Sequence, residues 1–222
     1  MLFNDNDRDR IGAAIGAAEA CTAGEIVVIV SGDDHRYPTT ALSIAALLAL
    51  SLPMLALLSG WSPAAWFADW DEAARPTSLR HTLEIIVCLQ ALVFAGGLAL
   101  LYFTSLGRKL TPAGLRRDRV HRAALTQFKA RGLEQTTGRT GVLIYIDEPE
   151  HIAEVVADTA IFAKVSPDHW GTTITALIDG MTAGKPADGV VAAIALAGDV
   201  LAEHFPILPD DVNELPDRLI EI

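Results

Sequence analysis

The sequence predicts an α/β domain that is interrupted by an inserted hairpin of two transmembrane helices. Residues 39–60 and 85–107 form two uncharged runs of 22 and 23 residues. A helix and an apolar strand precede the first run, and further strands and helices follow the second. One helix and one strand cannot close a hydrophobic core, so the segment before the hairpin must pair with elements beyond it.

The composition indicates a chain with one apolar part and one solvated part. Hydrophobic residues make up 51% of the chain, yet 20% of the residues are charged and the net charge is -11. Residues 140–222 carry 15 acidic side chains against three basic ones. Binding to nucleic acid needs clustered Lys and Arg that neutralise phosphates, so we expect no nucleic-acid partner. Cys21 and Cys88 lack the spacing of a zinc site.

The segment before the hairpin has the pattern of one helix followed by one strand. Asn6 or Asp7 is expected to cap a helix that continues to about Cys21, because these side chains accept hydrogen bonds from the first N–H groups of a helix. The stretch EIVVIVS, residues 25–31, is short, β-branched and apolar throughout most of its length. This pattern is typical of a central strand that is buried on both faces.

Each uncharged run is long enough to cross a bilayer, because about 20 apolar residues cover the hydrocarbon core. A pair of buried core helices is the alternative, although core helices rarely continue so long without a charge. The loop between the runs carries only Arg75 and Arg80 as basic residues other than histidine. Six basic residues follow the second run: Arg108, Lys109, Arg116, Arg117, Arg119 and Arg122. This asymmetry predicts a multi-pass protein with both termini in the cytoplasm and the lipid bilayer as its partner.

Beyond the hairpin, the pattern predicts helices and strands that complete the soluble domain. Thr111 is expected to cap a basic helix that starts at Pro112. A strand–helix–strand unit gives parallel neighbours through a right-handed crossover, so the membrane hairpin would be an insertion into a crossover. The predicted elements are a helix at 112–131, strands at 141–146 and 151–158 joined by the turn DEPE, a helix from Ser166, a helix at about 188–205 and a tail that packs as a strap or short strand.

The stretches AEACTAGEIVVIV and RTGVLIYIDEPEHIAEVVADTAI, followed by Trp170, Gly184 and Gly189, resemble the TPM domain family. The family includes a thylakoid acid phosphatase and membrane-tethered bacterial proteins. The resemblance implies a three-layer α/β/α sandwich with a small mixed sheet, in a protein of the bacterial inner membrane. It also implies acidic loops that bind calcium-type cations, and a phosphatase activity. The expected divisions are 1–36 for the first part of the domain, 37–107 for the transmembrane hairpin and 108–222 for the remainder.

Acidic residues follow the first two predicted strands at their carboxyl ends, where open α/β sheets place ligands. Asp33 and Asp34 come after the first strand, and Asp147 and Glu150 after the second. Two acidic loops on neighbouring parallel strands could supply the several oxygen ligands that Ca²⁺ or Mg²⁺ requires. The alternative is that these are ordinary solvated turn residues. Their mutual repulsion would be relieved by a bound divalent cation or by the basic residues near Arg116.

The functional prediction is a binding or regulatory module on the membrane that depends on a divalent cation, with a membrane protein as a candidate partner. Two alternatives stay open: a metal-assisted hydrolase of the acid phosphatase type, and a structural subunit of a membrane assembly. No catalytic residue is assigned, because Asp33 lacks the second acidic residue two positions on and the downstream Lys that an Asp nucleophile needs. Whether the protein is an enzyme is therefore left open.

Overall fold

The computed structural model describes residues 2–33, 36–60, 79–136, 138–207 and 213–222. The chain divides into two compact units. The first unit joins Met1–Asp34 to Ala113–Ile222, and the second is His35–Pro112. Segments from both ends of the sequence therefore build one unit.

The first unit is a mixed α/β domain built on a four-stranded sheet with the strand order β3-β2-β1-β4. β1 runs parallel to both of its neighbours, β2 and β4, whereas β2 and β3 are antiparallel. The predicted small mixed sheet is confirmed, and the tail supplies a short strand. The strands are β1 (Glu25–Ser31), β2 (Gly141–Asp147), β3 (Ile152–Ala157) and β4 (Leu219–Glu221).

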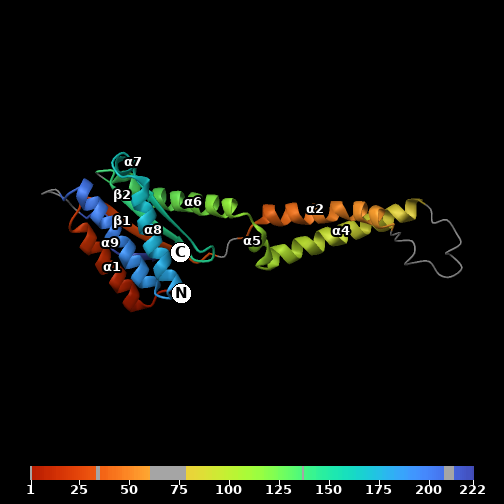
Figure 1. Ribbon diagram of the computed structural model, residues 1–222, viewed down its shortest axis with the longest axis horizontal. Helices are drawn as coiled ribbons and strands as arrows, with labels where there is room; N and C mark the ends of the chain where they lie inside the picture. The colour runs from red at the N-terminus through yellow and green to blue at the C-terminus, as the bar shows by residue number, and fades with distance from the viewer. Residues whose placement is uncertain (1, 34–35, 61–78, 137, 208–212) are drawn as a thin grey trace. The chain divides into compact units, whose positions relative to one another are not determined.

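Alternate residues of the two central strands enter two different hydrophobic clusters, because successive side chains of a strand point to opposite faces. Every residue of β1 and of β2 is buried. On one face, Val28 and Ile144 belong to a cluster that includes residues of α1 (Asp5–Glu19), α8 (Pro167–Thr182) and α9 (Pro186–His204). On the other face, Ile29 and Tyr145 belong to a cluster with residues of α6 (Ala113–Ala130). Figure 1 shows these helices around the strands.

The first helix begins earlier than predicted. Asn4 is the N-cap of α1, and its side chain accepts a hydrogen bond from the N–H of Asp7, while the Asp7 side chain accepts one from the N–H of Asn4. This reciprocal capping box satisfies two N–H groups at once. The expectation of a cap at Asn6 or Asp7 was therefore wrong. Ile11 and Ile15, one turn apart, are fully buried against the sheet.

The start of the basic helix also differs from the prediction. Thr111 is the residue that ends a short unpredicted helix, α5 (Leu106–Leu110). The Thr111 hydroxyl donates a 2.8 Å hydrogen bond to the carbonyl of Gly107, so it satisfies the end of the preceding helix. α6 begins two residues later, after Pro112, and Gly132 follows it in the left-handed region with φ 77°. Gly132 is at the predicted helix end.

The helices after the sheet follow the sequence pattern closely. Ser166 is the N-cap of α8, as expected, and Pro167 stands at the first helical position. Trp170 and Leu177 are buried on the inner face of α8. A short helix that the sequence pattern did not predict, α7 (Thr159–Phe162), precedes α8 and is capped by the carboxylate of Asp158. A 3₁₀ turn, η1 (Leu133–Gln135), leads from α6 toward β2.

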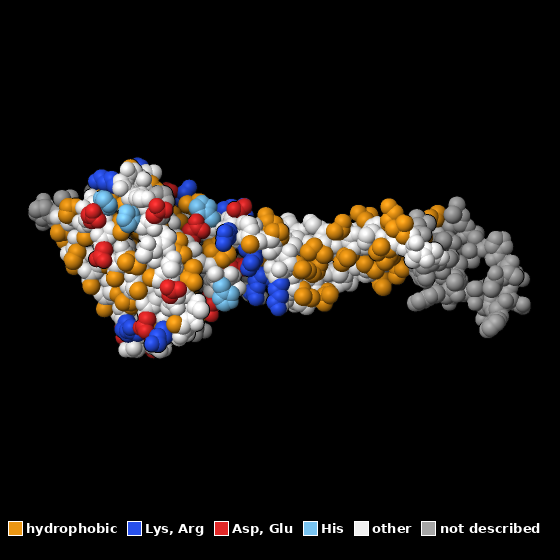
Figure 2. All heavy atoms as spheres, viewed as in Figure 1, with side chains coloured by type: hydrophobic (Ala, Val, Ile, Leu, Met, Phe, Trp, Pro, Cys, Tyr) orange, Lys and Arg blue, Asp and Glu red, His pale blue; other side chains and the backbone are white. Residues whose placement is uncertain are grey.

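In the described residues of the second unit, 36–60 and 79–112, the chain forms two long apolar helices and α5. These helices are α2 (Pro38–Ser59) and α4 (Leu79–Phe103), and they lie side by side in Figure 1. Both are long and apolar enough to cross a membrane, over Pro38–Ala56 and Leu83–Phe103, with 22% and 6% of those spans buried. Exposed hydrophobic side chains cover much of the face seen in Figure 2. α4 starts at Leu79, before the predicted start at 85, and ends at Phe103, before the predicted end at 107.

Candidate functional site

The predicted acidic edge lies where β1 and β2 end together. Ser31 and Asp147 are register partners at the ends of these strands, and the N–H of Glu148 donates a 3.0 Å hydrogen bond to the Ser31 carbonyl. The chain then turns toward β3. Asp147 Oδ1 accepts a 3.1 Å hydrogen bond from the N–H of Glu150, so the Asp147 side chain shapes this turn. The same bond brings these two acidic residues together.

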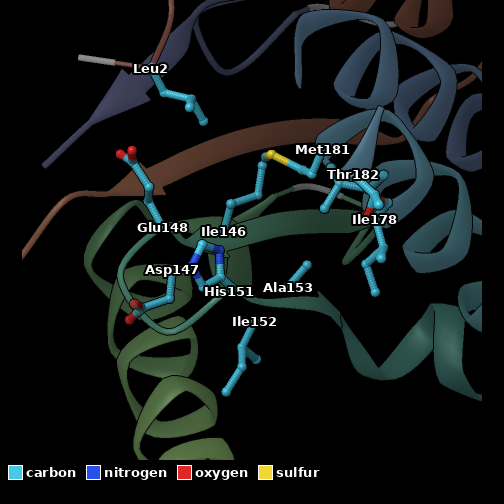
Figure 3. A pocket seen from close by; sticks show the side chains of 11 residues that line it. Leu2, Ile146, Asp147, Glu148, His151, Ile152, Ala153, Ile178, Met181 and Thr182 are labelled. Atoms are coloured by element: carbon cyan, nitrogen blue, oxygen red, sulfur yellow. The ribbon is translucent and has the colours of Figure 1, made fainter. Parts of the chain in front are cut away.

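Both acidic residues of this turn are buried, which the sequence pattern did not reveal. Asp147 is 0% exposed and Glu150 is 3% exposed. Burying a carboxylate is costly unless hydrogen bonds and an opposite charge compensate for the lost water. Arg116, on α6, supplies such a charge, with its Nη1 3.4 Å from Glu150 Oε2. Figure 3 shows the Asp147 carboxylate pointing to the side of the sheet where the green α6 lies. A basic residue that the sequence analysis proposed for this edge is therefore in contact with it.

The other two predicted ligands lie after β1. Asp33 is exposed, two residues beyond the end of the strand. Asp34 lies outside the residues that the structure describes. Burial raises the pKa of Tyr145, on β2, and the charges of Asp147 and Asp33 raise it further. Both carboxylates therefore act on the same phenol, so the two strand ends place Asp33 and Asp147 in one electrostatic environment.

The geometry provides oxygen donors but does not complete a metal site. Within 2–33, 36–60, 79–136, 138–207 and 213–222, no group of three or more His, Cys, Asp or Glu side chains could hold a metal ion. Because Asp34 is not among these residues, the set of Asp33, Asp34, Asp147 and Glu150 stays a prediction. Carboxylate oxygens are the ligands that Ca²⁺ and Mg²⁺ prefer, so the chemistry of the donors suits either cation.

A hollow of about 510 Å³ opens beside the same turn. Its apolar wall combines Leu2, near the N-terminus, with Ile178 and Met181 of α8. Polar residues that line it include Glu148 and His151 of the turn, and Figure 3 shows their side chains together with Leu2 and Met181. No sequence pattern indicated this hollow. Its lining comes from three distant segments, and the helical spacing of Ile178 and Met181 indicated only a core-facing stripe.

A second acidic group lies near the amino end of β1. Glu19 Oε1 accepts a 2.8 Å hydrogen bond from the N–H of Ile26, and Glu25 Oε1 accepts a 3.0 Å bond from the N–H of Glu214. Burial raises the pKa of Glu19 to about 8, and the charges of Glu25 and Asp217 add to the effect. These contacts join the start of the sheet to the C-terminal tail, which suggests a structural role.

The comparisons with known proteins show a likeness in fold and give no activity. The chain matches no protein-family model and no curated protein. It is similar to the NMR structure of the BA42 protein from the psychrophilic bacterium Bizionia argentinensis, with a TM-score of 0.59 and 20% sequence identity. The match covers 100% of this chain and 97% of that chain. At this level of identity the likeness concerns the fold alone.

Proposed function

We propose that the protein is a membrane-anchored binding module of the TPM type, with a three-layer α/β/α domain that responds to a divalent cation. The length and apolar surface of α2 and α4 support insertion of this pair as a transmembrane hairpin. The basic residues that follow α4 favour a bacterial inner membrane protein with both termini in the cytoplasm.

The observation that carries the cation proposal is the burial of Asp147 and Glu150 next to each other at the carboxyl end of β2. Arg116 brings one positive charge to this pair. A divalent cation held by Asp147 and Glu150, with Asp33 and Asp34 closing the site, would add the charge that two neighbouring carboxylates favour. The site is thus proposed to hold Ca²⁺ or Mg²⁺.

The same turn links the cation to a second ligand. Asp147 and Glu148 both line the 510 Å³ hollow, so ordering of the turn by a cation would also fix one wall of that hollow. An apolar side chain from a membrane protein partner fits the chemistry of Leu2, Ile178 and Met181. In this proposal the cation regulates the binding of the partner.

Calorimetry on the detergent-solubilised full chain tests the cation site. Wild type is expected to bind Ca²⁺ or Mg²⁺, and the variant Asp33→Asn with Asp147→Asn is expected to lose binding. The matched control carries Asp179→Asn and Asp199→Asn, which remove two exposed carboxylates elsewhere and should leave binding unchanged. The single variant Asp33→Asn keeps the buried Asp147 charge, so it still tests the site if the double variant does not fold. Equal binding by all variants, or no binding by wild type, contradicts the site.

Thiol labelling of intact cells tests the orientation. An impermeant maleimide should modify a cysteine introduced at Ser62, between the two spans, without lysis. The native thiol of Cys21 is exposed on the soluble unit and should react only after lysis. Reaction of Cys21 in intact cells would place the soluble unit outside.

A further inference from the structure

The carboxylate of Glu148 belongs to the hollow beside the turn between β2 and β3. All residues that line this hollow are part of the first unit. The N–H of Glu148 is bonded to the Ser31 carbonyl, which holds the backbone in place. The side chain is half-buried, and it makes no hydrogen bond or ion pair with any residue that the structure describes. A negative charge is therefore held at the hollow without a counter-charge from the described part of the chain.

His151 brings a flat ring to the same hollow. Its backbone lies in the left-handed region with φ 53°, and its N–H donates a 3.2 Å hydrogen bond to the Glu148 carbonyl. These two residues are thus held within one tight turn. The imidazole, like the Glu148 carboxylate, has no partner among the described residues, and Figure 3 shows it in the middle of the lining. A guanidinium group suits this pair, because it bonds carboxylates and stacks on flat rings.

The apolar wall of the hollow explains only part of its chemistry. Its volume of about 510 Å³ is typical of sites that enclose a ligand, so there is room for two neighbouring side chains. An apolar side chain suits Ile146, Ile178 and Met181. A partner that brought only apolar groups would remove water from the Glu148 carboxylate without replacing the lost hydrogen bonds, which is unfavourable. The occupant must therefore also supply a positive charge.

We propose that the partner presents an arginine next to its apolar side chain, with the guanidinium group held by Glu148 and His151. The inference rests on the proposed function, in which the hollow receives a side chain of a protein partner. Lysine carries the same charge but lacks the planar group that engages a carboxylate and a ring together. Residues 140–222 hold 15 acidic side chains against three basic ones, so the surrounding charge also attracts a basic partner.

Peptide binding to the full chain in phosphatidylcholine nanodiscs tests the inference without free detergent, which would compete for an apolar hollow. The probe is acetyl-Ala-Leu-Arg-Ala-amide, titrated by saturation-transfer NMR against empty nanodiscs as the blank. The matched peptide has citrulline in place of arginine, which keeps the shape of the side chain and removes its charge. Wild type should bind the arginine peptide about fivefold more tightly than the citrulline peptide. This comparison needs no change in the protein.

Protein variants then locate the site. Glu148→Gln should remove the preference for arginine, whereas Glu203→Gln, which neutralises an exposed acid on α9, should keep it. Ile178→Ser should weaken the binding of both peptides, and Leu115→Ser, at a similarly exposed leucine, should not.

Equal binding of the two peptides by wild type, or an unchanged preference in Glu148→Gln, overturns the inference. Binding of the citrulline peptide would in that case still support the apolar hollow of the proposed function. Failure of wild type to bind either peptide overturns the inference together with the role of the hollow in partner binding, while the cation site is judged separately by calorimetry. Binding of the arginine peptide that is the same with and without Ca²⁺ supports the arginine site and contradicts regulation by the cation.

Discussion

Replacement of Arg116 by Gln tests the charge balance of the acidic edge. The substitution removes the positive charge that lies 3.4 Å from Glu150 Oε2 and leaves the fully buried Glu150 side chain beside Asp147. Two neighbouring buried carboxylates then lack this counter-charge. We expect Arg116→Gln to lower the free energy of unfolding, and we expect Ca²⁺ to restore part of the loss.

The size of the loss follows from the geometry. Two unit charges 3.4 Å apart attract each other by about 5 kcal/mol at an effective dielectric constant of about 20. Desolvation offsets most of this attraction, and removal of one partner of a buried pair costs roughly 3–5 kcal/mol. The Arg116 side chain is 31% exposed, so water screens part of the interaction. The expected loss is therefore about 1–3 kcal/mol, or several degrees in Tm.

Thermal unfolding of the solubilised full chain, with and without Ca²⁺, measures both effects. Arg122→Gln on the exposed face of the same helix is the matched control and should stay close to wild type. Saturation with a cation at about 100 times its Kd stabilises a protein by roughly 2.7 kcal/mol. This gain should be larger in Arg116→Gln, because the cation no longer competes with the guanidinium group. Equal stability of Arg116→Gln and Arg122→Gln would refute a stabilising role of the Arg116 charge. Equal stabilisation of Arg116→Gln and wild type by Ca²⁺ would refute competition between the cation and the guanidinium group.

Three further predictions concern packing, pH and the split of the first unit. Gly180→Ala should lower the free energy of unfolding in denaturant titrations by about 1–3 kcal/mol, because a Cβ atom there would collide with the backbone of Gly189 on the facing helix. Gly171→Ala, where a Cβ atom would enter open space, should raise the free energy of unfolding by up to about 1 kcal/mol. Losses of the same size in both variants would contradict the close approach of the helices. Burial raises the pKa of Glu19 from 4.5 to about 8, so the folded state retains a proton that the unfolded state releases. Stability should therefore fall as pH rises from about 4.5 to about 8, and Glu19→Gln should flatten this slope; an unchanged slope would exclude Glu19 as its source. Residues 1–33 joined to 113–222 by a Gly/Ser linker should unfold cooperatively, while 113–222 alone should not, and circular dichroism melts that show the reverse would rule out a split unit.

The parts of the fold that sequence reasoning predicted are those with a local physical cause. The strand at 25–31 agrees with β1 because a short, β-branched apolar stretch suits a site buried on both faces. The start of α8 is marked by the Ser166–Pro167 pair, whose hydroxyl and fixed φ act within one turn. The apolar helices were predictable because an uncharged run long enough to cross a membrane is rare in the cores of soluble proteins.

The candidate site depends on contacts that no local pattern contains. The turn Asp-Glu-Pro-Glu has the composition of a solvated loop, yet Asp147 and Glu150 are buried. The buried Glu150 carboxylate contacts Arg116, which is 34 positions away from it in the sequence. The hollow depends in the same way on Leu2, whose position beside β2 follows only from the assembled sheet.

The long insertion between β1 and the later strands adds little to the entropic cost of pairing these strands. β1 has β2 on one side and β4 on the other, and both of these neighbours come after the hairpin. A flexible insertion of this length would add only a slowly growing entropic cost to that pairing. The ordered hairpin reduces even this cost, because Arg36 at its start contacts Tyr102 near its end. The insertion therefore behaves as a short closed loop between β1 and the later strands that pair with it.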